Sequence, residues 1–448
     1  MKKNARRESL RTLITLAIPV ILEQILTQLL QYVDTAMVGR LGAQATASVS
    51  LTTTVNWLIG NIFAATGIAV VAMVSSAYGA GNREKIGKVT SQAVLYIGVT
   101  GSAVTALAVG LSPFIPIWMQ ADVSIRAQAS LYFRIISIPL MFRASSIICA
   151  SALRAVKNTR TPMVINLVAN IVNVVLNYIL IYPAGLGVTG AAIATAVSSV
   201  ISGLAMFIIM LRNPVLGFSF RGTRFDRAIL KETASIGLPA LATSMASCMG
   251  HIVFASLVSS MGTTVFAAHS IALSAETMFY LPGYGLRSAT STLIGISVGE
   301  DDRDKFRVVE RQSMLLTIAM MVFNGILLFI FARPIMAIFS PDEEVIYLGA
   351  RVLRLIAVSE PLFGLMIVSE GIYYGLGQTK VTFIVETIGS WGIRIVFTVI
   401  CVHVLHASLF EVWICMFADN AFRAIAMATP LLTGRDVRYF EKRRSRMV

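Results

Sequence analysis

Apolar segments of membrane-spanning length recur along the whole chain, and this feature limits the possible folds more than any other. A helix needs roughly 20 apolar residues to cross the hydrocarbon core of a bilayer. A barrel would instead alternate apolar and polar residues in strands of roughly ten. The sequence therefore predicts an all-α membrane protein with about twelve transmembrane helices, at 14–38, 46–77, 89–111, 128–152, 162–181, 189–211, 233–259, 265–298, 312–331, 347–375, 381–402 and 409–432.

The chain also repeats its own pattern at an offset of 220 residues. The matching pairs include Leu10 and Leu230, Pro19 and Pro239, Gly42 and Gly262, Gly79 and Gly299, and Arg83 and Arg303. Six helices in each copy return the chain to the side where it began, so the copies are parallel repeats, a layout typical of secondary transporters. We expect two six-helix lobes, 1–211 and 230–448, around a central cleft. A charged cytoplasmic linker at 212–229 joins them, and the second lobe ends in a basic cytoplasmic tail.

Positive charge is concentrated on one predicted side of the membrane. The net charge is +14, and 27 of the 37 Lys and Arg residues fall in segments that share the side of the N-terminus. This bias follows the positive-inside rule and predicts that both termini are cytoplasmic. It also accounts for the basic balance without a nucleic-acid partner. We expect a multi-pass protein of the plasma membrane, which in a bacterium is the inner membrane.

The sequence indicates neither a metal site built from cysteines or histidines nor nucleotide chemistry. The cysteines fall within predicted spans without metal-ligand spacing, which favours a packing role: Cys149, Cys248, Cys401 and Cys415. The histidines are scattered, whereas a membrane enzyme would need clustered acids or histidines near an interface. No phosphate-binding loop is present, so we expect no coupling to ATP. We expect no enzymatic activity and no cofactor.

Acidic residues at membrane depth are costly, so each one is a candidate functional group. Asp34 lies near the end of the first predicted span, and Glu23 lies three helical turns earlier on nearly the same face. At the repeat offset, the second half has Phe254 in place of Asp34. We expect Asp34 to couple transport to an ion, and the alternative is a helix-end acid paired with Arg40. Glu23 either lines a substrate cavity or bonds across helices.

Four asparagines follow one stripe of the fifth predicted span, at Asn166, Asn170, Asn173 and Asn177. Their spacing places all four amides on one helix face. Amides that faced lipid would lack partners, so the stripe is expected to face the lobe interior. Two interpretations stay open: hydrogen bonding between helices alone, or a polar cavity whose amide oxygens help to coordinate a cation. Thr195 and Tyr132 are candidates for the same cavity.

The second half carries polar groups of its own. His269 and Glu276 lie two turns apart on one face of the eighth predicted span, and Glu370 lies in the tenth. We take these three as candidates for the substrate cavity. Asp419 and Arg423 stand at i, i+4, which favours a structural ion pair. The other charged residues expected at depth are Glu360, Glu386, Glu411 and Arg394.

Several motifs resemble the multidrug and toxic compound extrusion (MATE) transporters from about residue 10 to residue 433. The motifs are YVDTAMVGRLG at 32–42, NVVLNY at 173–178, GVTGAAIAT at 187–195, AAHSI at 267–271 and ATSTLIG at 289–295. The resemblance implies twelve helices in two lobes that form a V around a central cleft. It also implies export of organic, often cationic, compounds against an inward gradient of H⁺ or Na⁺.

The resemblance assigns roles in the first lobe residue by residue. Asp34 matches the first-helix acid that serves as the family's main coupling residue in this lobe. Asn173 matches a fifth-helix amide, Thr195 a sixth-helix hydroxyl and Tyr132 a fourth-helix tyrosine of the same cavity. Asn177 stands where some members have an acid, so this cavity would hold one negative charge fewer. A Na⁺ site would use Asp34, Asn173 and Thr195.

The second lobe departs from one branch of the family. The NorM-like branch carries an acid in the seventh helix and another in the tenth, where this chain has Ser247 and Phe363. The resemblance therefore does not imply a NorM-like sodium site here, and it favours H⁺ over Na⁺ as the coupling ion.

We expect a secondary active antiporter that exports small organic cations or drugs by alternating access and works among membrane lipids. A lipid-linked saccharide flippase of the same superfamily is the alternative, although such proteins generally have about fourteen helices and a basic cavity. A major-facilitator carrier would have a basic loop motif after its second helix, which residues 79–85 match only loosely. No feature of the sequence specifies an oligomeric state.

Overall fold

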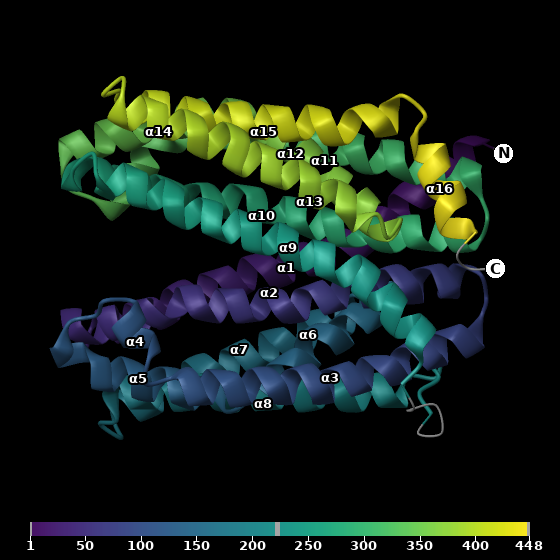
Figure 1. Ribbon diagram of the computed structural model, residues 1–448, viewed down its shortest axis with the longest axis horizontal. Coiled ribbons are helices and arrows are strands. Elements are labelled where there is room, and N and C mark those ends of the chain that lie inside the picture. Colours follow the sequence, from purple (N-terminus) through teal and green to yellow (C-terminus); the bar gives the residue numbers. More distant parts are fainter. Residues whose placement is uncertain (1, 220–224, 446–448) are drawn as a thin grey trace. The chain divides into compact units, whose positions relative to one another are not determined.

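The computed structural model describes residues 2–219 and 225–445, which form helices joined by turns and loops (Figure 1). Residues 220–224 of the predicted linker and 446–448 of the predicted tail lie outside the described residues. The helices are α1 (Lys2–Gly39), α2 (Ala43–Gly79), α3 (Arg83–Leu111), α4 (Ile115–Trp118), α5 (Val123–Ser137), α6 (Leu140–Ala155), α7 (Arg160–Ile181), α8 (Gly187–Arg212), α9 (Arg227–Ser259), α10 (Thr263–Gly299), α11 (Arg303–Phe339), α12 (Glu343–Gly375), α13 (Thr379–Thr387), the π-helix η2 (Ile388–Ile395), α14 (Val396–His403), α15 (Leu409–Leu432) and α16 (Asp436–Arg444).

The described helices confirm an all-α membrane protein. Nine of them, counting α13, η2 and α14 as one, are long and apolar enough to cross a membrane. The pair α5 and α6, bent by 48° at a short break, makes a tenth span. Two more long helices, α10 and α15, carry charged side chains in their middle parts. Together these elements give the layout of about twelve helices that the sequence predicts.

The chain separates into two compact units, and two helices contribute to both. One unit contains residues up to Ile21 together with Leu238 onward, and the other contains Leu22–Gly237. Helices α1 and α9 therefore each begin packed in one unit and end packed in the other. The units divide the chain by packing, whereas the predicted boundaries 1–211, 212–229 and 230–448 divide it by repeat, so those boundaries stay a prediction.

The two halves share backbone features at equivalent positions, as well as sequence. Helices α2 and α10 begin and end at the same repeat positions, and each follows a glycine with positive φ, 106° at Gly42 and 122° at Gly262. Only glycine adopts such angles without strain. The next helices, α3 and α11, are capped by Asn82 and Asp302, whose side chains accept from the backbone N–H three residues later. The same turns and N-caps therefore set where the equivalent helices begin in each half.

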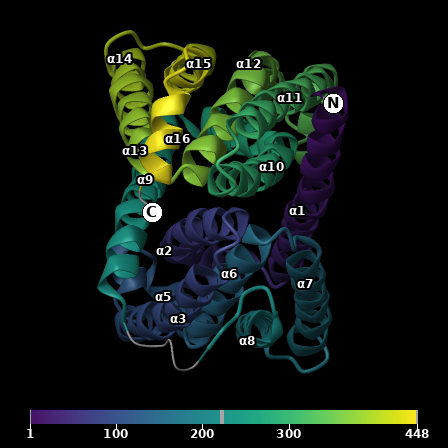
Figure 2. The same ribbon diagram turned by 90° about the vertical axis from the view of Figure 1, so that its right-hand side faces the viewer.

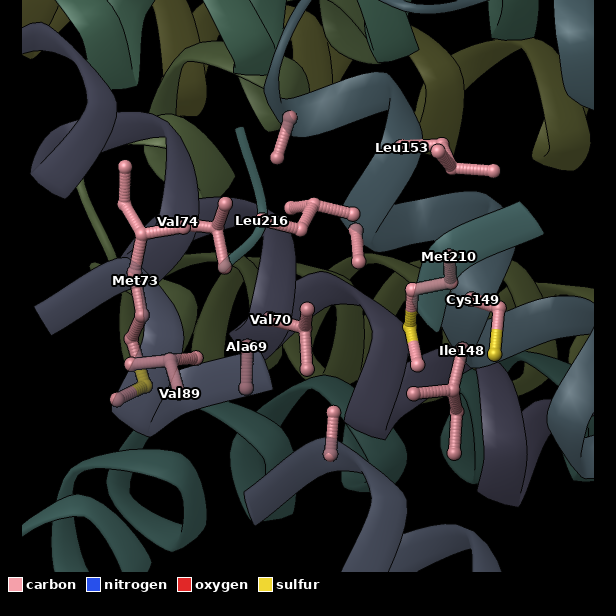
Figure 3. Packing of buried hydrophobic residues seen from close by; sticks show 14 of the residues in the cluster. Ala69, Val70, Met73, Val74, Val89, Ile148, Cys149, Leu153, Met210 and Leu216 are labelled. Carbon is pink, nitrogen blue, oxygen red and sulfur yellow. The ribbon is translucent and has the colours of Figure 1, made fainter. Parts of the chain in front are cut away.

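The core of the Leu22–Gly237 unit forms where α2, α3, α6 and α8 meet. Figure 3 shows apolar side chains of these helices turned toward one another, among them Met73, Val89, Ile148 and Met210. Cys149 lies fully buried in this cluster, in the packing role that its position indicates. Figure 2 shows α3, α6 and α8 running side by side in the same bundle. The close packing fixes α6 and α8 as a rigid support for α7, which packs on α8.

Six of the 13 prolines lie inside continuous helices, and one coincides with a break between helices. Pro19, Pro239 and Pro361 are interior residues of α1, α9 and α12. Only Pro139 coincides with the break between α5 and α6. A π-helical stretch, η2, interrupts the segment from α13 to α14, and such stretches often mark functional positions.

At Gly203, where α8 packs against α6, there is no room for a larger side chain. A Cβ at Gly203 would lie 2.7 Å from the carbonyl carbon of Phe142, which is too close for real contacts. We expect Gly203→Ala to lower stability by about 1–3 kcal/mol because the helices must move apart. Gly98→Ala in α3 is the control, since nothing lies within 4 Å of that position. Helix propensity alone predicts that the control is neutral or stabilised by up to about 1 kcal/mol.

Thermal unfolding of both variants in detergent measures this difference. Equal melting temperatures for the two variants would contradict the packing described for α6 and α8.

Candidate functional site

A polar seam joins α1 to α7 within the Leu22–Gly237 unit. Three asparagines of α7 donate hydrogen bonds to α1 side chains exactly 143 positions earlier: Asn166 to Glu23 at 2.6 Å, Asn170 to Thr27 at 3.1 Å, and Asn177 to Asp34. A constant offset means that the two helices run parallel in one register, with matching faces. Their segments lie side by side in Figure 2. The asparagine stripe thus faces the interior of this unit and holds α1 in place.

Glu23 is neutralised at one end of the seam. The Arg154 guanidinium donates to both carboxylate oxygens, at 2.7 and 2.8 Å, and Asn166 adds a third bond. Both charged side chains are largely buried, so the pair must be complete to be tolerated. Of the two interpretations given for Glu23, the structure favours bonding across helices. The partner comes from the end of α6, a segment that the sequence assigns to a cytoplasmic basic run.

Asp34 lies at the other end of the seam in a different environment. Its hydrogen-bond partner is the Asn177 amide, which is fully buried. No Lys or Arg of the described residues forms an ion pair with Asp34, and Arg40, the alternative partner, forms none with it. The Asn177 Oδ1 atom is buried without a hydrogen-bond partner. An uncompensated carboxylate beside an orphan amide oxygen is an arrangement that binding a proton or a cation would complete.

The other residues predicted for this cavity gather around Asp34. Asn173 accepts a bond from Asn177 at 3.3 Å and donates to Thr195 on α8 at 3.4 Å. Tyr132 on α5 is buried and lies close enough to Asp34 and Thr195 to interact with both. Four helices therefore supply one polar cluster. Asn170 is not part of it, because its amide bonds Thr27 one level away.

The other unit has no counterpart of this cluster at the repeat position. Phe254, which corresponds to Asp34, is buried in an apolar core, and its ring lies 5.5 Å from the ring of His269. The Trp413 ring also packs on His269, with 5.7 Å between the ring centroids. His269 is thus enclosed by aromatic rings, and its Nδ1 atom has no hydrogen-bond partner. Packing, rather than a seam of amides, holds the second-half helices here.

Four charged groups at depth in this unit form a neutral network. Arg394, in the π-helix, pairs with Asp419 at 2.8 Å, and Arg423 pairs with Asp419 at 2.8 Å and with Glu386 at 2.7 Å. The i, i+4 pair predicted for Asp419 and Arg423 is therefore present. All four side chains are buried. Two arginines and two acids balance, which makes this network a structural link between α13, η2 and α15.

Glu411 does not lie at depth as the sequence suggests. It occupies the third position of α15, where it forms a capping box with Ser408 and is exposed. The Ser-x-x-Glu spacing is the sequence signature of such a cap.

The remaining predicted acids of this unit differ in their partners. Glu370 pairs with Arg287 and accepts a bond from Tyr374 at 2.5 Å, so its charge is balanced. Glu276 has one buried oxygen without a partner. Glu360 on α12 interacts electrostatically with Glu276, is 1% exposed, and has no partner at either oxygen. The sequence does not distinguish Glu360 from the other acids in apolar spans and so predicts no role for it.

Ser247 and Phe363 occupy the places where the NorM-like branch has acids. The Ser247 carbonyl accepts a bond from the His251 ring at 2.8 Å, and the Phe363 ring packs on Tyr280. Neither position offers a carboxylate.

Comparison with known proteins identifies a matching family and several similar proteins. A family model described as MatE matches residues 19–179 and 239–400, one match in each repeat. The chain is 27% identical over 432 residues to the probable multidrug resistance protein NorM of Thermotoga maritima, covering 95% of this chain and 92% of that protein. It is 27% identical to the multidrug resistance protein MdtK of Edwardsiella ictaluri, with 85% of each chain covered.

Solved structures agree with the sequence comparison on the fold. A crystal structure of MATE in complex with MaL6 superposes with a TM-score of 0.90 at 21% identity, covering 97% of both chains. The fold is that of a multi-pass membrane transporter. The chain belongs to the MatE family, the multidrug and toxic compound extrusion transporters, which are transport proteins and not enzymes.

Removing Arg154 alone should be far more harmful than removing it together with its partner. Arg154→Met leaves the buried Glu23 carboxylate without its cation, and we expect a loss of about 3–5 kcal/mol. In the double variant Glu23→Leu, Arg154→Met, most of that loss should be recovered because no unpaired charge remains. Thermal unfolding of the single and double variants tests this. If the loss in the double variant equals the sum of the losses in Arg154→Met and in Glu23→Leu alone, the ion pair is not the reason for the burial of Glu23.

Proposed function

We propose that this protein is a multidrug efflux antiporter that exports organic, mainly cationic compounds in exchange for H⁺, with Asp34 as the coupling group. The relatives that span nearly the whole chain are named as multidrug resistance proteins, which supports drug-like organic substrates. The single observation that carries the assignment is the contrast within the seam. Glu23 is neutralised by a guanidinium, whereas Asp34 has only an amide.

The contrast matters because the two acids share one helix face and one partner helix. A carboxylate that is permanently paired has no reason to exchange its charge state during transport. A carboxylate without a cation stays charged at a high desolvation cost unless a proton or metal ion neutralises it. Asp34 is therefore the acid of the seam suited to gain and lose a positive charge in each cycle.

The hydrogen-bond directions support H⁺ over Na⁺. Asn177 presents its NH₂ group to Asp34, and Asn173 presents its NH₂ group to Thr195, so donors point at two of the three oxygens proposed for a Na⁺ site. A metal ion needs several oxygens turned toward it, and an amide donor in that place would repel it. A proton on Asp34 needs only a local change of bonding, in which the neutral acid can donate to the orphan Asn177 oxygen.

Proton binding would change the seam and so bias the conformation of α1. Exchange requires that the proton and the drug each bind the two states of the transporter differently. Protonated Asp34 holds the Asn177 amide less strongly, because a charge-assisted hydrogen bond becomes a neutral one. The loosened α1 is the element that we propose to change position when the drug is released.

The proposal includes a setting for the protein. Both termini lie in the cytoplasm, as the distribution of Lys and Arg indicates, and Asp34 lies toward the outer side, where it can take up external protons. No cofactor is needed, because the ion gradient supplies the driving force.

Neutralising Asp34 should abolish coupled transport. In protein-only proteoliposomes, we expect ΔpH alone to drive efflux of a fluorescent cationic dye by the wild type. Asp34→Asn should reduce this to the level of empty vesicles, because the side chain can no longer change charge. Asn170→Leu is the matched control, since it removes a seam amide that bonds only Thr27, and it should keep most of the activity.

The same vesicles distinguish the coupling ions. Dye efflux that responds to a Na⁺ gradient and not to ΔpH would overturn H⁺ coupling while leaving Asp34 as the site. Unchanged ΔpH-driven efflux in a well-folded Asp34→Asn protein would overturn the role of Asp34.

A further inference from the structure

An apolar groove lies beside the polar seam, between the end of α1 and the end of α7. Its volume is about 530 Å³. On α1 it is lined by one helical stripe that includes Val33, Met37 and Arg40. These residues flank Asp34 on the adjacent face of the helix. The groove therefore lies against the same helix segment that carries the proposed coupling acid.

The α7 wall of the groove continues into a longer apolar surface. Val175, Tyr178 and Tyr182 line the groove, and Tyr178 is 60% exposed. The same helix face carries exposed Val164, Val168 and Ile171, at the spacing of a single stripe. A continuous stripe of exposed apolar side chains along a membrane helix is a surface for hydrocarbon chains.

The end of the groove near the loop between α1 and α2 is polar and positive. Arg40 is exposed and has no ion pair or hydrogen bond from its side chain among the described residues. The Tyr182 hydroxyl donates to the Met37 carbonyl at 3.0 Å, and its ring lies 5.8 Å from that of Tyr178. Tyrosines of this kind gather at the level of lipid headgroups. The groove thus has a hydrocarbon part, an interfacial part and one unpartnered guanidinium.

From this arrangement we propose that the groove binds one anionic phospholipid, with its phosphate on Arg40 and an acyl chain along Val33, Val175 and the α7 stripe. A guanidinium pairs with phosphate through parallel hydrogen bonds, which a zwitterionic headgroup also offers but with its charge offset by choline. The same guanidinium repels the cationic compounds of the proposed function. The groove is therefore a lipid site and not a drug site.

The lipid would stabilise the contact between α1 and α7 along the polar seam. A chain lying in the groove gives packing partners to the α1 and α7 side chains that line it. It holds the two helices together at the level where Asn177 bonds Asp34. The lipid contacts do not depend on which ion is transported, whereas the exclusion of drugs from the groove rests on the cationic substrates of the proposed function.

Native mass spectrometry of the full protein, released from detergent with defined lipids, tests the proposal. With equal amounts of phosphatidylglycerol and phosphatidylcholine, we expect the wild type to retain one phosphatidylglycerol preferentially. Arg40→Gln should reduce that preference about fivefold, the effect of one arginine at an anionic lipid. Arg126→Gln is the control, since the Arg126 Nε already donates to the Ala121 carbonyl at 2.8 Å, and it should change nothing.

A second variant tests the hydrocarbon part. Val175→Trp fills the groove without removing the charge, and it should reduce retention of both lipids. Retained preference in Arg40→Gln, or equal loss in Arg126→Gln, would overturn the site. Displacement of the bound lipid by a cationic dye in the wild type would make the groove a drug site and would also overturn the proposal.

Discussion

The interior of a membrane offers no water to a charged side chain, and most of this structure can be understood from how each charge is compensated. Glu23 takes Arg154, Glu370 takes Arg287, and Asp419 is held between two arginines. These pairs tie together helices that are far apart in the sequence. They allow spans such as α10 and α15 to carry charge at depth without losing their place in the fold.

Against this background the uncompensated acids are informative. Asp34, Glu276 and Glu360 are the acids at depth that lack a cationic partner within the described residues. The repeat allows a direct comparison, because the position equivalent to Asp34 is occupied by Phe254, which has a structural role in an apolar core. It packs on His269 and is buried. A polar seam in one half and an aromatic core in the other give two similar folds different chemistry.

Sequence reasoning could predict the elements of this site better than their partners. The spacing of the asparagines fixed the face of α7, and the repeat fixed the turns at Gly42 and Gly262. It could not show that Arg154 reaches Glu23, because the pair depends on how α6 packs and Arg154 lies beyond the predicted span 128–152. The π-helix η2 could not be predicted either, since its residues have the composition of an ordinary apolar span. Glu360 could not be separated from its paired neighbours without knowing which arginines reach them.

The division of α1 between the two units bears on how the protein is made. The first half of this helix packs with residues from Leu238 onward, as shown by Ile21 against Gly285 and by Gln312, which donates to the Arg6 carbonyl at 2.6 Å. Those partners are synthesised more than two hundred residues later. The nascent chain must therefore hold its first helix in the membrane with half of its packing surface uncovered until the second repeat arrives. Contacts so distant in sequence form slowly, and an unfinished chain exposes that surface to other proteins in the meantime.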